Sequence, residues 1–133
     1  MKIGNNRNVL LVEDEAPVRR LISKFLQMHD FNVLEATQGE EALAVSESFP
    51  GTIHLLITDI MMPVMNGHEL ANRLASLRPH LSVLFISGYP GKHLPEGLES
   101  MATMDYLAKP FKFDVLIAKV ALLSRPADSE SPA

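Results

Sequence analysis

Four polar residues directly follow short, mainly apolar segments of the sequence. Glu13 and Asp14 follow NVLLV, Asp59 follows HLLIT, and Lys109 follows DYLA. Carboxylates that lie close together repel, and a pair about 4 Å apart costs roughly 4 kcal/mol at an effective dielectric of ~20. A divalent cation relieves this repulsion, and because the chain has no cysteine, an oxygen-ligated ion such as Mg²⁺ is favoured. The open coordination positions of such an ion suit a phosphoryl group.

The elements that position these residues alternate along the chain. Short apolar segments typical of buried parallel strands alternate with segments whose apolar residues recur at helical spacing. Strands are predicted at 8–14, 32–36, 53–58, 82–86 and 104–107, with helices between them and a last helix at 114–123. This alternation predicts right-handed crossovers and a parallel sheet covered on both faces, which is a three-layer, doubly wound α/β fold of the (βα)5 type.

Ligands of such sheets bind outside the carboxyl ends of the strands. The fold therefore predicts that one edge of the sheet gathers the polar residues that follow its strands, namely Glu13, Asp14, Asp59, Ser87 and Lys109.

Local signals predict helix starts and buried faces. Thr37 with Glu40, and Asn66 with Glu69, match the capping-box pattern at two helix starts. The periodicity predicts that the first helix, 17–28, buries Val18, Leu21, Ile22, Phe25 and Leu26. It predicts that the helix after Asn66 buries Leu70, Leu74 and Leu77.

Composition restricts the class of protein. The 133 residues, 47% of them hydrophobic, are enough for one globular domain with a substantial core. A formal net charge of −4 and the lack of a Lys/Arg run argue against a nucleic-acid surface. The lack of cysteine fits a reducing compartment, and the sequence shows neither a signal peptide nor a membrane-spanning apolar run. We expect a cytoplasmic protein with no direct contact to nucleic acid or membrane.

The motifs LLVEDE, LLITDIMMPVMNG, LFISG and DYLAKPF occur together in one order and spacing. With these motifs the chain resembles the response-regulator receiver domain of two-component signalling, and the resemblance extends from Asn8 to about Leu123. The resemblance implies a five-stranded parallel sheet in the flavodoxin-like order 2-1-3-4-5. We therefore expect a short N-terminal tail at 1–7 and a receiver domain at 8–124, and the polar composition after the last helix predicts a disordered C-terminal tail at 125–133.

The resemblance also implies a role for each matching residue. Asp59 would be the phosphoacceptor for a phosphohistidine on a histidine kinase or histidine phosphotransfer protein. Asp14 and Asp59 through their carboxylates, and Met61 through its backbone carbonyl, would bind Mg²⁺, with Mn²⁺ as the alternative, and Glu13 would act through water. Lys109 would pair with Asp59 and then with the phosphoryl oxygens.

A switch is part of the same resemblance. Ser87 would move to bond the phosphoryl group, Tyr106 would fill the vacated space, and the docking surface would change. Lys109–Pro110 matches the cis peptide bond of the family. The domain would not be a conventional enzyme, because it would catalyse only its own phosphorylation and slow autodephosphorylation. The donor would dock on the helix at 17–28, and the domain would be a monomer or weak dimer.

Other functions fit the motifs less well. A phosphatase of the haloacid dehalogenase class needs a second acid two residues after the nucleophile, where this chain has Met61. A flavodoxin-like carrier needs a phosphate loop after the first strand, where the acidic EDEAP would repel phosphate. A non-phosphorylated scaffold receiver would have lost Asp59 or Lys109, and both are present. A receiver module excised from a hybrid histidine kinase or another larger regulator remains an open alternative.

The chain departs from the family pattern between Ser87 and Tyr106. Several prolines and glycines predict that segment 88–103 is mobile and that its helix is short, at 96–102. Bulky Tyr89 and Met61, near the phosphoacceptor, are expected to slow loss of the phosphoryl group. The histidines lack metal-ligand spacing and are expected at surface or hydrogen-bonded positions; they are His29, His54, His68, His80 and His93.

Overall fold

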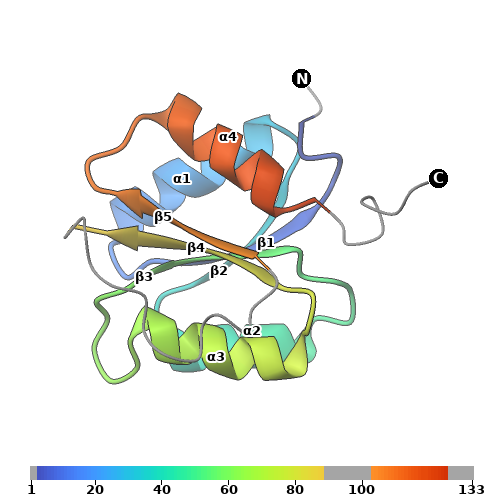
Figure 1. Ribbon diagram of the computed structural model, residues 1–133, viewed down its shortest axis with the longest axis vertical. Helices are drawn as coiled ribbons and strands as arrows, with labels where there is room; N and C mark the ends of the chain where they lie inside the picture. Colours follow the sequence, from blue (N-terminus) through green and yellow to red (C-terminus); the bar gives the residue numbers. More distant parts are fainter. Residues whose placement is uncertain (1–2, 89–102, 126–133) are drawn as a thin grey trace.

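A computed structural model describes residues 3–88 and 103–125 of the chain (Figure 1). Its strands form one parallel sheet in the order β2-β1-β3-β4-β5, as predicted. The strands are β1 (Asn8–Val12), β2 (Asn32–Ala36), β3 (Leu55–Asp59), β4 (Ser82–Ser87) and β5 (Thr103–Ala108). The described helices are α1 (Ala16–Met28), α2 (Gly39–Ser48), α3 (Gly67–Leu77) and α4 (Phe113–Leu123). The predicted short helix at 96–102, Tyr89 and His93 lie outside the described residues, as do residues 126–133 of the C-terminal tail.

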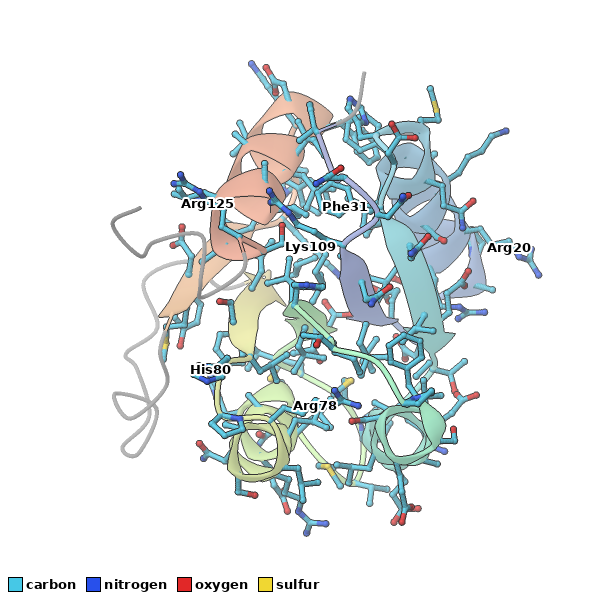
Figure 2. All side chains as sticks on the ribbon, turned by 90° about the vertical axis from the view of Figure 1, so that its right-hand side faces the viewer. Arg20, Phe31, Arg78, His80, Lys109 and Arg125 are labelled. Atoms are coloured by element: carbon cyan, nitrogen blue, oxygen red, sulfur yellow. The ribbon has the colours of Figure 1, made fainter. Side chains whose placement is uncertain are left out.

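The helices cover both faces of the sheet, which confirms the three-layer α/β prediction. Figure 1 shows α1 and α4 on one face, and α2 and α3 on the other. Because side chains alternate along a strand, β1 supplies both cores: Leu10 and Val12 pack on the α2–α3 side, and Val9 and Leu11 on the α1–α4 side. Phe31, labelled in Figure 2, lies between α1 and α4. All five residues of the central strand β3 are buried, so its end is held in a fixed position.

Two leucines predicted to be buried are exposed instead. Leu21 on α1 has a relative exposure of 55% and Leu77 on α3 has 69%. Leu21 lines a groove beside Phe113, and Leu77 lines a groove beside Leu43 between α2 and α3. Both side chains are exposed in these surface grooves, whereas Ile22, Leu26, Leu70 and Leu74 are buried as predicted.

One of the two predicted helix caps forms as expected. The Asn66 side chain accepts a hydrogen bond from the Glu69 backbone N–H at 2.8 Å, which caps α3. The predicted pairing of Thr37 with Glu40 is wrong. Helix α2 begins one residue later than that pattern requires, so the Thr37 N–H and hydroxyl both donate to Glu41 at 2.7 Å. These hydrogen bonds lower the pKa of Glu41.

None of the helices in 3–88 and 103–125 is both long enough and apolar enough to span a membrane.

Candidate functional site

Three carboxylates converge at the carboxyl end of the sheet. Strands β1 and β3 are adjacent and parallel, with Val12 opposite Thr58, so the residues that follow on each strand lie side by side. Carboxylate oxygens of Glu13, Asp14 and Asp59 lie within 4.8 Å of one another. Glu13 and Asp59 are buried and Asp14 is exposed. This group of oxygen ligands is suited to a metal ion.

Lys109 brings a positive charge to the buried carboxylates. Its Nζ lies 3.0 Å from Asp59 Oδ1 and 3.7 Å from Glu13 Oε1. Its backbone N–H donates to the Ser87 carbonyl at 2.7 Å, and the Lys109–Pro110 peptide bond is cis, the geometry that the resemblance implies. Burial would lower the pKa of Lys109, but the hydrogen bond to Asp59 and the nearby carboxylate charges raise it on balance. Lys109 therefore stays charged at neutral pH.

One lysine does not neutralise the whole group of acids. Glu13 is only 2% exposed, and burial, together with a hydrogen bond to Asp59, raises its pKa to about 8. The Glu15 N–H donates to Glu13 Oε2 at 3.1 Å, which acts in the opposite direction without cancelling the rise. In the metal-free protein the Glu13 side chain thus holds a proton near neutral pH, and a bound cation would replace that proton.

The segment after β3 folds back tightly onto the site. The Gly67 N–H donates to the Ile60 carbonyl at 2.9 Å. A Cβ atom at Gly67 would lie 2.2 Å from the backbone oxygen of Asp59, so only glycine fits at this position. The start of α3 therefore packs directly on the residue at the end of β3.

The remaining predicted residues lie around this group. Ser87 is buried at the end of β4, whose Ile86 is opposite Asp59 in the sheet. Tyr106 on β5 is half-buried, and its ring stacks on Phe85 with the centroids 5.1 Å apart. Met61, two residues after Asp59, is 70% exposed.

Comparison with known proteins agrees with this geometry. A family model described as the response regulator receiver domain matches residues 9–121. The chain belongs to this family. Two Brucella abortus relatives show the contexts in which such a domain occurs. The chain is 34% identical over 118 residues to the sensor kinase CckA, a match that covers 89% of this chain and 12% of CckA. It is 32% identical to the response regulator receiver protein CpdR, a match that covers 86% of this chain and 93% of CpdR.

Solved receiver structures have the same fold. The response regulator TrrA of Thermotoga maritima, in complex with Mg²⁺-BeF, superposes with a TM-score of 0.75 at 30% identity, and the match covers 88% of this chain and 98% of TrrA. The receiver domain of the hybrid histidine kinase CckA gives a TM-score of 0.74 at 34% identity, covering 89% of this chain and 99% of that one. TrrA in complex with the histidine kinase ThkA gives a TM-score of 0.73 at 30% identity, covering 88% and 97%.

Sequence reasoning missed two residues near the site of this receiver domain. Arg19 donates to the Glu13 carbonyl at 2.9 Å and pairs with Glu35 at 3.1 Å, which joins α1 and β2 to the end of β1. His68, at the start of α3, lies with its Nε2 3.2 Å from the Tyr106 hydroxyl. The Arg19–Glu35 and His68–Tyr106 contacts join residues 16 and 38 positions apart, so no local pattern in the sequence marks them.

Proposed function

We propose that this receiver domain transfers a phosphoryl group from a phosphohistidine to Asp59. A bond forms between a carboxylate oxygen of Asp59 and phosphorus, and the P–N bond to the donor histidine breaks. The observation that carries this proposal is the placement of Asp59. It lies at the end of a rigid buried strand, 3.0 Å from Lys109 and within 4.8 Å of two further carboxylates. Phosphoryl transfer depends mainly on such positioning and on charge neutralisation.

The acidic residues would hold Mg²⁺ in this reaction, with Mn²⁺ as the alternative. Asp14 and Asp59 would be carboxylate ligands, Met61 would contribute its backbone carbonyl, and Glu13 would act through water. The fit rests on donor chemistry: three carboxyl groups lie within 4.8 Å, and burial, with the neighbouring Asp59, raises the pKa of Glu13, so its ionised form lacks full compensation without a cation. The ion would neutralise charge on the phosphoryl oxygens when bound.

Lys109 and Ser87 would complete the binding of the phosphoryl group. Lys109 would exchange its contact with Asp59 for one with the phosphoryl oxygens, and the buried Ser87 hydroxyl would move to bond the same group. Tyr106 would then fill the space that Ser87 leaves, and the surface around β5 would change. Reversing a 1:99 population ratio takes about 5.5 kcal/mol, which several charge-assisted hydrogen bonds to a dianion could supply.

The phosphohistidine donor would dock along α1, beside the acceptor site. A groove of about 410 Å³ runs between α1 and the segment after Lys109, and its lining is mainly apolar: Val18, Leu21, Ile22, Pro110, Phe111 and Phe113, with Glu15 and Lys109. A donor helix seated there would bring its phosphohistidine next to Lys109 and Asp59. A histidine kinase or a histidine phosphotransfer protein is the proposed partner, and TrrA is a relative solved in complex with a histidine kinase.

The proposed domain spans 8–124, acts in the cytoplasm, and is a monomer or weak dimer. It would catalyse only its own phosphorylation and slow autodephosphorylation. The same chemistry would serve a receiver that is a small part of its protein, as in CckA, or nearly all of it, as in CpdR.

The test is phosphorylation by acetyl phosphate with Mg²⁺, followed by intact mass. We expect a single acid-stable, base-labile phosphoryl adduct in the wild type and none in Asp59→Asn or in the presence of EDTA. Asp30→Asn is the matched control, because it makes the same change before β2, at the opposite end of the sheet, and should leave the adduct intact. A folded, Mg²⁺-binding wild type that forms no adduct, either here or with a phosphohistidine donor, would favour a scaffold receiver. An adduct that persists in Asp59→Asn would place the acceptor elsewhere.

A further inference from the structure

Three aromatic rings from three elements meet beside the site. His68 of α3 packs edge-on against Phe85 of β4, with the centroids 4.8 Å apart and an interplanar angle of 60°. Tyr106 of β5 stacks on the same Phe85 ring at 5.1 Å and 30°. His68 Nε2 lies 3.2 Å from the Tyr106 hydroxyl. Within the described part of the chain, Tyr106 therefore stacks on Phe85, and it contacts His68 through a hydrogen bond and an edge-on ring contact.

His68 is itself held in place by its neighbours in the chain. It follows Gly67, which packs on the backbone oxygen of Asp59, and the Asn66 cap fixes the first turn of the helix. A shift of the Asp59 backbone would move the start of α3 and the imidazole with it. The His68 ring is thus a short physical connection between the end of β3 and the side chain of Tyr106.

The surroundings of His68 favour the neutral form of its imidazole. Burial lowers the pKa of His68, and the first turn of a helix also disfavours a positive charge. A neutral ring makes one hydrogen bond to the phenol in either tautomer: Nε2 accepts from the hydroxyl, or Nε2–H donates to its oxygen. A purely apolar residue at position 68 could fill the space against Phe85 but could not make this bond.

We propose that His68 is a positioning residue that holds the Tyr106 ring against Phe85 and ties its rotamer to the start of α3. The hydrogen bond between His68 and Tyr106 is present in the unphosphorylated protein. Its consequence for signalling rests on the proposed function, because a phosphorylation-driven movement of Tyr106 would have to break or rearrange the bond to His68. Loss of one neutral hydrogen bond raises the population of alternative Tyr106 rotamers by about fivefold.

The test observes the ring directly by NMR. The chain has two tyrosines and no tryptophan, so Tyr89→Phe leaves Tyr106 as the sole tyrosine. We expect the Tyr106 ring protons of this parent to be shifted upfield by the stacked Phe85 ring. His68→Leu should move them toward the values of free tyrosine, and His68→Gln, whose amide can bond the hydroxyl, should restore most of the upfield shift. Unchanged Tyr106 signals in a folded His68→Leu variant would overturn the proposal.

Two further measurements separate this proposal from the function of the site. If His68→Leu fails to fold, His68→Asn and His68→Gln are compared instead. The longer Gln side chain is expected to hold the ring better, and the proposal fails if the two variants show equal Tyr106 shifts. Addition of Mg²⁺ and beryllofluoride, a phosphoryl mimic, should change the Tyr106 signals less in His68→Leu than in the parent, because the variant begins with a mixed rotamer population. Failure of Asp59 to react would refute the proposed function and leave the metal-free NMR result standing.

Discussion

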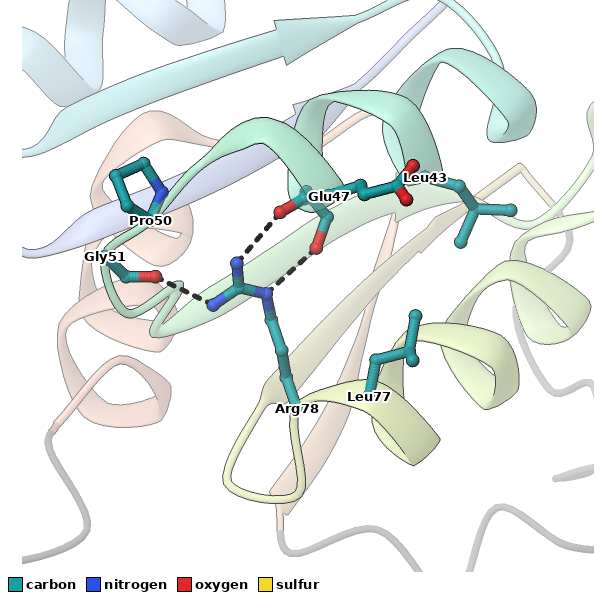
Figure 3. A pocket seen from close by; sticks show the side chains of 7 residues that line it. Leu43, Glu47, Pro50, Gly51, Leu77 and Arg78 are labelled. Carbon is teal, nitrogen blue, oxygen red and sulfur yellow. Dashed lines mark hydrogen bonds between the residues drawn. The ribbon is translucent and has the colours of Figure 1, made fainter.

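At the carboxyl end of the sheet, the buried acids Glu13 and Asp59 share Lys109, whereas at the amino end Arg78 donates to neutral oxygens. Arg78 follows α3, and Figure 3 shows its guanidinium directed toward the end of α2 and the loop before β3. It donates to Ser46 Oγ at 2.9 Å and to the carbonyls of Ser46, Phe49 and Gly51 at 3.0, 3.0 and 2.8 Å. Ser46 and Phe49 lie at the carboxyl end of α2, the helix pole where a positive charge is favoured, and Gly51 lies in the loop that follows.

The two ends of the sheet therefore have different expected roles: the contacts at the amino end stabilise the fold, and the residues at the carboxyl end serve its function. These contacts provide hydrogen-bond partners for the Arg78 guanidinium and for its acceptor oxygens, so their expected role is to hold α2 and α3 together. At the carboxyl end, burial and the neighbouring Asp59 raise the pKa of Glu13, so ionising all of its acids is unfavourable without a bound cation. Binding of a cation, and then of a phosphoryl group, would stabilise such a site. Substitutions at the two ends should therefore change different measured quantities.

The largest expected effect is at Lys109. Replacing Lys109 with alanine removes the cation that lies 3.0 Å from Asp59, and we expect the rate of Asp59 phosphorylation to fall about 100-fold or more. The measurement is adduct formation with acetyl phosphate at saturating Mg²⁺. Lys24→Ala, an exposed lysine on α1, is the matched control. Equal rates for the two variants would remove Lys109 from the proposed chemistry.

The reverse result is expected at Arg78. Arg78→Ala should lower the free energy of unfolding by about 3 kcal/mol, because it deletes four hydrogen bonds made by a charged donor, and it should leave the phosphorylation rate unchanged. Chemical denaturation measures the first quantity. Arg73→Ala, which breaks an exposed pair with Glu69 on α3, should lower it by only about 0.5 kcal/mol. If the two arginine variants were equally stable, the contacts in Figure 3 would have no special role.

A substitution at Gly67 tests whether the carboxyl end of the sheet also depends on tight packing. Gly67→Ala places a Cβ atom against the Asp59 backbone oxygen, and we expect it to lower the free energy of unfolding by about 2 kcal/mol and to slow phosphorylation by displacing Asp59. Gly88→Ala is the control, since a Cβ there meets no atom of residues 3–88 and 103–125 within 4 Å. A Gly67→Ala variant with unchanged stability and rate would show that the start of α3 can shift without disturbing the acceptor.

Much of the carboxyl end could be predicted from the sequence, because its residues follow strands. A parallel sheet brings the ends of its strands to one edge, so the meeting of Glu13, Asp59 and Lys109 follows from the alternation of strand and helix. The strand order came instead from the family resemblance. The three-layer fold and this order are both confirmed.

The amino end could not be predicted in the same way. Arg78 contacts Ser46 from 32 positions away, and no local pattern marks such a pair. Periodicity had a similar limit at Leu21 and Leu77. It shows which residues share a helix face, and only the packing of neighbouring elements decides whether that face is covered.

The last expected effect concerns protons at Glu13. Its pKa is raised from 4.5 in the unfolded chain to about 8 in the metal-free fold, so the folded state binds the proton more tightly. Its contribution to stability is therefore complete below pH 4.5 and is lost as pH rises through about 8. In EDTA, wild type should lose more stability between pH 6 and pH 8.5 than Glu13→Gln does, whereas exposed Glu40→Gln should behave as wild type.

The same proton links pH to metal binding. A cation that displaces one proton binds more tightly as pH rises, so apparent Mg²⁺ affinity should increase by up to about tenfold per pH unit below pH 8 and level off above it. The measurement is a Mg²⁺ titration by calorimetry in buffers of different ionisation enthalpy, which counts the protons released. Glu13→Gln should release fewer protons and show a flatter pH profile. A wild type that releases no proton near neutral pH would mean that Glu13 is already ionised there and that Lys109 compensates its charge. The charges at the two ends of the sheet would then both be compensated within the protein.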